Sequence, residues 1–231
     1  MADSTIQNRV AKCEGGTTDI IVHEVKGPDT LQEIHHPFGG CYGGNTVNEQ
    51  FVSFLDKIFG EDVVQHIRKN YPSEYFDLLS EFENKKTSFS GENSDDISVR
   101  LPLKWLTCFQ EKTERSISEE VKKPTLKNKV SVRNDKMRIK HDVFLSFFEY
   151  SIKKVLEILE KLLKKPHIRN IDLLLAVGGY CESMFLINAI RQRFPKLNVI
   201  QPKDPSLAVL KGAVLYGFKS HTVSRLASHY C

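Results

Sequence analysis

Apolar residues recur at helical spacing along much of the chain. The longest stripe follows Asp142, a residue that favours helix N-caps, and predicts one long helix. Its members are Val143, Phe144, Phe147, Phe148, Ile152, Val155, Leu156, Leu159, Leu162 and Leu163. Three helices are predicted upstream, from a capping box at Thr46–Glu49 to Gly60, over 61–70, and over 73 to about 90. Tyr71-Pro72 separates the last two, because the residue before proline disfavours helix.

Two regions read as strands. Thr17–Lys26 is rich in β-branched residues, and a Gly-Pro-Asp turn joins it to 30–34, which predicts a hairpin. Further on, the apolar run 171–177 ends at Gly178-Gly179 and is followed by a helix, a strand at 199–200 and a helix from Pro205 to Gly217. This alternation predicts a parallel βαβ crossover. Between these regions, short alternating runs in 91–135 indicate a small sheet or an irregular insert.

Charge adds one local feature to this picture. The chain of 231 residues carries a net charge of +4, and the segment 111–140 holds ten Lys/Arg against five Asp/Glu. This segment has no aromatic residue for base stacking, and its acids are interspersed. A solvated basic insert therefore explains it better than nucleic-acid binding.

Composition also favours a soluble protein, which we expect in the cytoplasm. The N-terminus lacks the apolar core of a signal peptide, and no apolar stretch is long enough to span a bilayer, so we expect no membrane partner. Five scattered cysteines without a CxxC pair predict reduced thiols, not a zinc site or a disulfide framework.

Glycine pairs are the first candidates for chemistry. Gly15-Gly16 precedes the hairpin and Gly178-Gly179 opens a helix, and both positions suit a phosphate that approaches the backbone. The steric needs of a tight turn explain each pair alone better than a phosphate does. The adjacent His35-His36 reads as a solvated pair, since neighbours in a strand point to opposite faces.

Polar side chains offer two further candidates. Glu83, Lys86 and Ser90 share one helix face at i, i+3 and i+7, where they could hydrogen-bond a ribose and a base, although an exposed surface pair is the simpler explanation. Asp19 could hold a magnesium-bound water beside phosphates, but one carboxylate is not a metal site.

Three phrases, taken together and in order, resemble the 70-kDa heat-shock protein family within the actin-like ATPase superfold, in an atypical branch of that family. They are CEGGTTDIIVHEV (13–25), LLLAVGGYCESMFLINAI (173–190) and DPSLAVLKGAVLYG (204–217). The resemblance implies an α/β actin-like (ribonuclease H-like) lobe with a mixed sheet flanked by helices. It places the lobe core at 13–44 and 136–218, a helical and small-sheet subdomain covering the nucleotide at 45–135, a divergent segment at 1–12 and a tail at 219–231.

The family's site residues carry over by position. The resemblance implies ATP or ADP with magnesium as cofactor, and it assigns nucleotide contacts to Gly15, Gly16, Thr17, Thr18, Glu83, Lys86, Ser90, Gly178, Gly179, Tyr180 and Glu182. Asp19 matches the acidic residue near the metal. We expect one sheet to contain the hairpin and both later strands. We also expect Glu83, Lys86 and Ser90 to be partly exposed in the same cleft as Gly179.

Departures from the family pattern point to a weakened site. Lys12, Cys13 and Glu14 stand where the family has an aspartate and its first glycine, Thr87 replaces an adenine-stacking arginine, and Tyr180 replaces a serine. The family's first phosphate loop has no match here and would precede Met1. We therefore expect a chain truncated to one lobe of the site and inactive in hydrolysis alone.

Two functions remain open. The first is an ATP-binding, chaperone-related protein of the stress response, with co-chaperones or client proteins as partners. The second is a non-catalytic interaction module that has kept the fold and no longer binds nucleotide.

Overall fold

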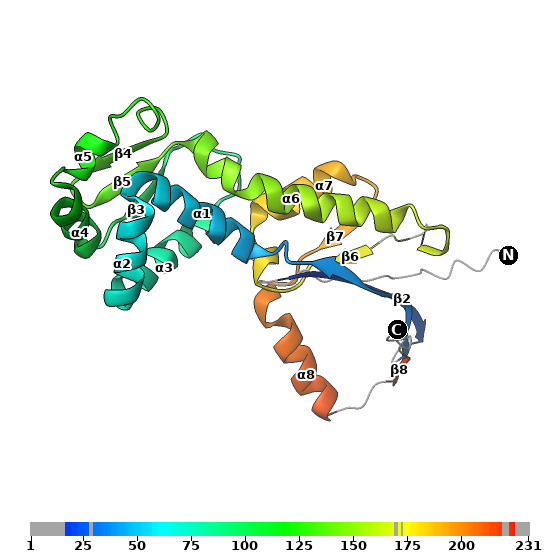
Figure 1. Cartoon of the computed structure of the whole chain (residues 1–231). Coiled ribbons are helices and arrows are strands. Elements are labelled where there is room, and N and C mark those ends of the chain that lie inside the picture. Colours follow the sequence, from blue (N-terminus) through cyan, green and yellow to red (C-terminus); the bar gives the residue numbers. More distant parts are fainter. Residues whose placement is uncertain (1–16, 28–29, 169–170, 172, 219–221, 225–231) are drawn as a thin grey trace, which may run out of the picture. The chain divides into compact units, whose positions relative to one another are not determined.

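The computed structural model divides the chain into two compact units (Figure 1). It describes residues 17–27, 30–168, 171, 173–218 and 222–224. Unit 1 comprises Met1–Asn45 and Ser151–Cys231, and unit 2 comprises Thr46–Tyr150.

Unit 2 combines helices with a small antiparallel sheet. Its helices are α1 (Gly44–Phe59), α2 (Glu61–Asn70), α3 (Pro72–Ser88), α4 (Leu103–Thr113), α5 (Ile117–Glu120) and the first part of α6 (His141–Leu163). Its strands, β3 (Ile97–Arg100), β4 (Val130–Arg133) and β5 (Lys136–Ile139), pair in the order β3-β5-β4. The long helix and the small sheet predicted from the sequence are thus confirmed.

Aromatic side chains fill the core of unit 2. Phe51 of α1 and Phe82 of α3 stack with ring centroids 3.9 Å apart and planes 2° from parallel, and neither is exposed to solvent. Phe147 of α6 packs against both rings. Trp105 of α4 lies edge-on to Phe59 of α1 and donates its indole N–H to the carbonyl of Glu74 on α3. These contacts hold α1, α3 and α6 together.

Unit 1 is built around two small sheets. The first contains β1 (Thr18–Gly27) and β2 (Thr30–Gly40) as an antiparallel hairpin, with β8 (Thr222–Ser224) parallel to β2. The second pairs β6 (Leu173–Leu175) with β7 (Asn198–Ile200) in parallel. The helices and 3₁₀ turns are η1 (Pro166–Ile168), η2 (Gly179–Glu182), α7 (Met184–Arg193), η3 (Pro205–Leu207), α8 (Ala208–Phe218) and the last part of α6. The predicted hairpin and βαβ crossover are confirmed.

The hairpin requires glycine where its strands come closest. Gly39 pairs with Asp19, and a Cβ atom at position 39 would lie 1.8 Å from the carbonyl oxygen of Thr18. Such an approach is impossible for any side chain, so this glycine serves strand pairing.

The expectation of a single shared sheet was wrong for the described residues. The hairpin and the β6-β7 pair belong to separate sheets. The alternation of apolar residues predicts that a segment is a strand, but it does not select the partner strand. The α/β class itself is confirmed, as a mixed arrangement of helices and small sheets.

Two helix boundaries also differ from the prediction. α1 begins at Gly44, so Thr46–Glu49 lies inside the helix and is not its cap. α3 ends at Ser88 and is followed by extended Phe89, which takes Ser90 off the helix. Buried Phe89 packs against Phe144 and Phe148, and this packing overrides continuation of the helix.

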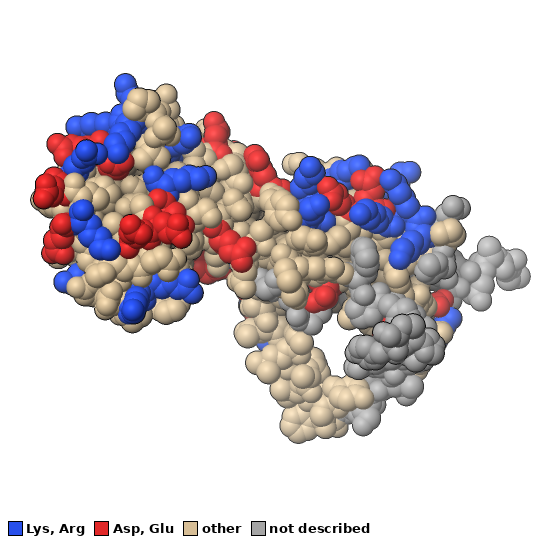
Figure 2. Space-filling view, viewed as in Figure 1, with Lys and Arg blue, Asp and Glu red and all other residues tan. Residues whose placement is uncertain are grey.

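Helix α8 is apolar and exposed. None of its residues is buried, and its visible surface in Figure 2 is almost entirely tan. Its large exposed side chains are Val209, Leu210, Val214, Leu215, Tyr216 and Phe218. Within the described part of the chain, no helix combines the length and the hydropathy needed to cross a membrane.

We predict that Phe51→Ala destabilises the protein by about 3–5 kcal/mol, because it removes one ring of a solvent-free stack. Urea denaturation measures this free energy of unfolding. Leu103→Ala is the control, since Leu103 is 72% exposed and its removal should cost less than about 0.5 kcal/mol. Equal, small changes in both variants would contradict the packing.

Candidate functional site

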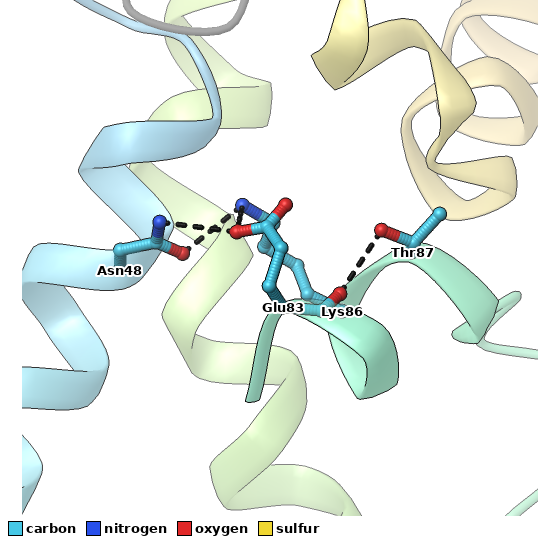
Figure 3. Close-up of polar contacts among 4 residues, drawn as sticks. All are labelled: Asn48, Glu83, Lys86 and Thr87. Carbon is cyan, nitrogen blue, oxygen red and sulfur yellow. Dashed lines mark hydrogen bonds and ion pairs between the residues drawn. The ribbon is translucent and has the colours of Figure 1, made fainter. Parts of the chain in front are cut away.

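Three polar side chains of unit 2 form a closed group on α1 and α3 (Figure 3). The Lys86 ammonium donates to Glu83 Oε2 at 2.6 Å and to Asn48 Oδ1 at 3.0 Å. Asn48 Nδ2 in turn donates to Glu83 Oε2 at 3.1 Å. The Glu83 carboxylate is therefore held by two donors that converge on one of its oxygens.

The two charged members differ sharply in exposure. The Lys86 side chain is 6% exposed, whereas that of Glu83 is 48% exposed. Burial lowers the pKa of Lys86, and the hydrogen bond and charge of Glu83 oppose that shift. The expectation that Lys86 is a partly exposed surface residue was wrong: its long stem is covered by the unit, and its charge is satisfied internally.

Ser90 and Thr87, the other residues of unit 2 considered for nucleotide contact, make different hydrogen bonds. Ser90 is half-buried beyond the end of α3, and its hydroxyl accepts from the backbone N–H of Glu92. Thr87, the residue in place of the family's arginine, donates its hydroxyl to the carbonyl of Glu83 (Figure 3). Asn48 was missed by the sequence analysis, because nothing in the spacing of α1 marks it as a neighbour of α3.

In unit 1 the residues after β6 form a tight, anchored turn. Gly178 has φ = 97°, a conformation that favours glycine, and its N–H donates to the carbonyl of Pro205 at 2.7 Å. The Gln201 amide donates to the carbonyl of Cys181 at 2.7 Å, which fixes η2. Gly179 is exposed, and a Cβ atom there would meet nothing within 4 Å. The turn therefore presents bare backbone to its surroundings.

Tyr180 and Glu182 are the other residues of this turn that were predicted to contact the nucleotide. The Tyr180 side chain is buried, and its hydroxyl lies 2.9 Å from the hydroxyl oxygen of Ser151. Ser151 Oγ also lies 2.6 Å from the carbonyl oxygen of Tyr42. Tyr180 thus belongs to an internal network in place of the family's small serine. Glu182 is half-buried in the last position of η2.

The start of β1 holds the predicted phosphate and metal residues. Thr17 donates its hydroxyl to Asp19 Oδ2 at 2.7 Å. Thr18 is fully buried, and its Oγ1 has no hydrogen-bond partner. Gly15 and Gly16 lie outside the described residues, as do Lys12, Cys13 and Glu14.

These residues meet part of what an adenine nucleotide with magnesium requires. Within unit 2, the exposed Glu83 carboxylate can accept hydrogen bonds from ribose hydroxyls. Within unit 1, the bare backbone at Gly179 admits close approach of a ligand. Among the described residues, no three His, Cys, Asp or Glu side chains cluster as metal ligands.

Three curated proteins are similar to this chain over most of its length. It is 30% identical over 205 residues to heat shock 70 kDa protein 12A of Mus musculus, and 29% identical over 205 residues to the Homo sapiens protein of that name, covering 88% of this chain in both. The identity to heat shock 70 kDa protein 12B of Homo sapiens is 28% over 211 residues, or 90% of this chain. The chain is a homologue of heat shock 70 kDa proteins 12A and 12B. The resemblance to the 70-kDa heat-shock protein family is thereby confirmed.

The similarity covers only part of these relatives. The chain spans 30% of the two 12A proteins and 31% of 12B. No family model matches the chain. The assignment of nucleotide contacts to individual residues stays a prediction, as does the single cleft expected to join Glu83 of unit 2 to Gly179 of unit 1.

We predict that Lys86→Met changes the pH dependence of stability. Because the pKa of Lys86 is lowered in the folded protein, the unfolded chain binds more protons between that pKa and about 10.4. The free energy of unfolding of the parent should therefore rise relative to Lys86→Met as the pH increases through this window. Urea denaturation at several alkaline pH values measures the difference.

Lys85→Met is the matched control, because the Lys85 side chain is 40% exposed on the same helix. Lys85→Met removes the same charge as Lys86→Met, so the effect of burial is the pH dependence that Lys86→Met shows in excess of this control. The absence of such an excess would show that the Lys86 ammonium is solvated.

Proposed function

We propose that this chain contributes residues to an adenine-nucleotide site of a protein related to heat shock 70 kDa proteins 12A and 12B. The observation that carries the proposal is the Glu83 carboxylate, which is half-exposed while Lys86 and Asn48 fix its position. A fixed carboxylate loses little side-chain entropy when it accepts hydrogen bonds from the two hydroxyls of a ribose. The similarity to the 12A and 12B proteins supports the adenine-nucleotide class.

Each residue of the group has a distinct role in this proposal. Glu83 contacts the ribose, whereas Lys86 is a positioning residue whose ammonium points to Glu83 and Asn48 (Figure 3). Asn48 completes the group by donating to the same carboxylate oxygen. Both of these hydrogen bonds go to Glu83 Oε2, so among the described residues neither Asn48 nor Lys86 occupies Oε1.

In unit 1, the turn after β6 is a separate candidate for backbone contacts to a ligand. Gly178 takes the positive φ that the turn needs, and Gly179 leaves space for a ligand against the main chain. Magnesium, when bound with the nucleotide, would neutralise phosphate charge, and Asp19 is the side chain proposed to orient its water shell. Thr17 restrains that carboxylate by donating to Oδ2.

We propose that nucleotide binding by this chain is weak and that hydrolysis needs groups beyond those described. Phosphoryl transfer depends on charge stabilisation around the transferred group from several directions. Asp19 and the main chain at Gly179 supply few such groups. A role as a chaperone-related ATP-binding protein, with co-chaperones or clients, follows as the family-level proposal.

The second candidate is a non-catalytic interaction module. The exposed apolar surface of α8 favours it, because such surfaces mark sites of protein association. If the parent chain does not bind nucleotide, the interaction module is the better explanation of its function.

We predict that Glu83→Gln weakens ATP binding by about tenfold to a hundredfold, since a hydrogen bond to a charged group is worth about 1.5–3 kcal/mol. Calorimetric titration with Mg-ATP measures the affinity, and phosphate release in the same samples should remain at background. Glu81→Gln, on the same helix and paired with Lys85, is the control and should bind like the parent. Equal affinity in all three proteins would remove Glu83 from the site.

We predict that two adjacent glycine substitutions separate folding from binding. Gly179→Val should leave stability nearly unchanged, because its Cβ enters open space, but should weaken nucleotide binding by filling the ligand's approach. Gly178→Val should destabilise the fold by about 1–3 kcal/mol, because φ = 97° is strained for a side chain. Thermal unfolding and titration of both variants test this pattern, and unchanged affinity in Gly179→Val would contradict it.

A further inference from the structure

The small sheet of unit 2 has one buried and one exposed face. Val99, Val132 and Met137 are buried on the inner face. On the outer face the register sets two rows across the strand order β3-β5-β4. The first row is Ser98, Arg138 and Ser131, and the second is Arg100, Lys136 and Arg133. All six residues are exposed.

The second row places like charges directly opposite each other. Lys136 of β5 faces Arg100 on one side and Arg133 on the other, an arrangement that destabilises a sheet. Arg100 is paired with Asp135 through a 2.8 Å contact. The described part of the chain gives Arg133 and Lys136 no acidic partner. The row therefore carries uncompensated positive charge.

In the first row, Arg138 lies between two hydroxyl groups. Ser98 and Ser131 face it from the neighbouring strands. Asp96 senses the charge of Arg138, and the pKa of Asp96 is lowered mainly by a hydrogen bond from Lys140 and further by that charge. Because Asp96 is already bound to Lys140, it leaves Arg138 only partly compensated.

Protection of sheet edges explains only part of the positive charge on the outer face. Charged side chains on edge strands prevent pairing with other molecules, which accounts for Arg100 and Arg133 on β3 and β4. Lys136 and Arg138 stand on β5, the central strand, where both edges are already paired. Their placement on the outer face calls for a different reason.

The surface over this part of the outer face is hollowed. The hollow has a volume of about 470 Å³, which is within the size range of small-molecule sites. Its lining consists of Ser98, Ser131, Arg133, Asn134, Asp135, Lys136 and Arg138. No aromatic residue is among them, so the hollow lacks the stacking surface that single-stranded nucleic acid uses. Arginine, lysine and serine are the donors that bind phosphoryl oxygens.

We propose that the outer face of the β3-β5-β4 sheet binds a small soluble ligand that carries two or more phosphoryl groups. Adjacent rows on one face of a strand are about 6.6–6.8 Å apart, so two phosphoryl groups of one ligand can engage both rows. One group lies at Arg138 with its two flanking serines, and the other lies at Arg133 and Lys136. The ligand supplies the negative charge that the sheet lacks.

The test uses inositol hexakisphosphate as the probe, titrated into the full chain by calorimetry. Binding should weaken at least about tenfold in Arg133→Gln/Lys136→Gln and also in Arg138→Gln, since each loses charge-assisted hydrogen bonds. The control is Lys57→Gln/Lys69→Gln, which removes two positive charges from exposed helix positions of the same unit. It should bind within about twofold of the parent. Circular dichroism of every variant verifies the fold.

Three results would overturn the proposal. They are no binding of the probe to the folded parent, equal weakening in the control, and tighter binding of a single-stranded oligonucleotide or of vesicles containing a phosphoinositide than of the soluble probe. Glu83→Gln should bind the probe like the parent, because Glu83 is not part of the hollow. This arm keeps the outcome independent of the proposed nucleotide site.

Discussion

The stack of Phe51 on Phe82 determines where the polar group of unit 2 can form. Asn48 is one turn before Phe51 on α1, and Lys86 is one turn after Phe82 on α3. Because the rings are parallel and 3.9 Å apart, the two helices present these polar residues to each other within hydrogen-bond distance. A looser core would leave the buried Lys86 ammonium with Glu83, its neighbour on α3, but without the hydrogen bond to Asn48.

Burial of Lys86 changes what the neighbouring acid can do. An ammonium in solvent would be a weak and mobile partner for Glu83, whereas the buried one is limited to few conformations. Glu83 is therefore ordered when the protein folds, and the loss of side-chain entropy occurs in that step. The turn at Gly178 is likewise ordered by folding, because its N–H donates to the Pro205 carbonyl.

The sequence could predict the elements more fully than their arrangement. Periodicity indicated α6 and the hairpin, because burial of one face repeats along the chain. It could not show that the hairpin and the β6-β7 pair lie in separate sheets, since partner choice depends on distant residues. Spacing placed Glu83 and Lys86 on one face, but burial of Lys86 and the contribution of Asn48 arise from packing of α1 on α3.

The contact at Gly39 limits which inherited changes this hairpin can accept. Every other amino acid places an atom 1.8 Å from the Thr18 carbonyl oxygen, so no substitution can preserve the Asp19–Gly39 pairing. A missense change at this codon would act by reducing the amount of folded protein in the cell, and chemistry elsewhere in the chain would be lost with it. Selection should therefore retain glycine at position 39 whether or not any ligand is bound.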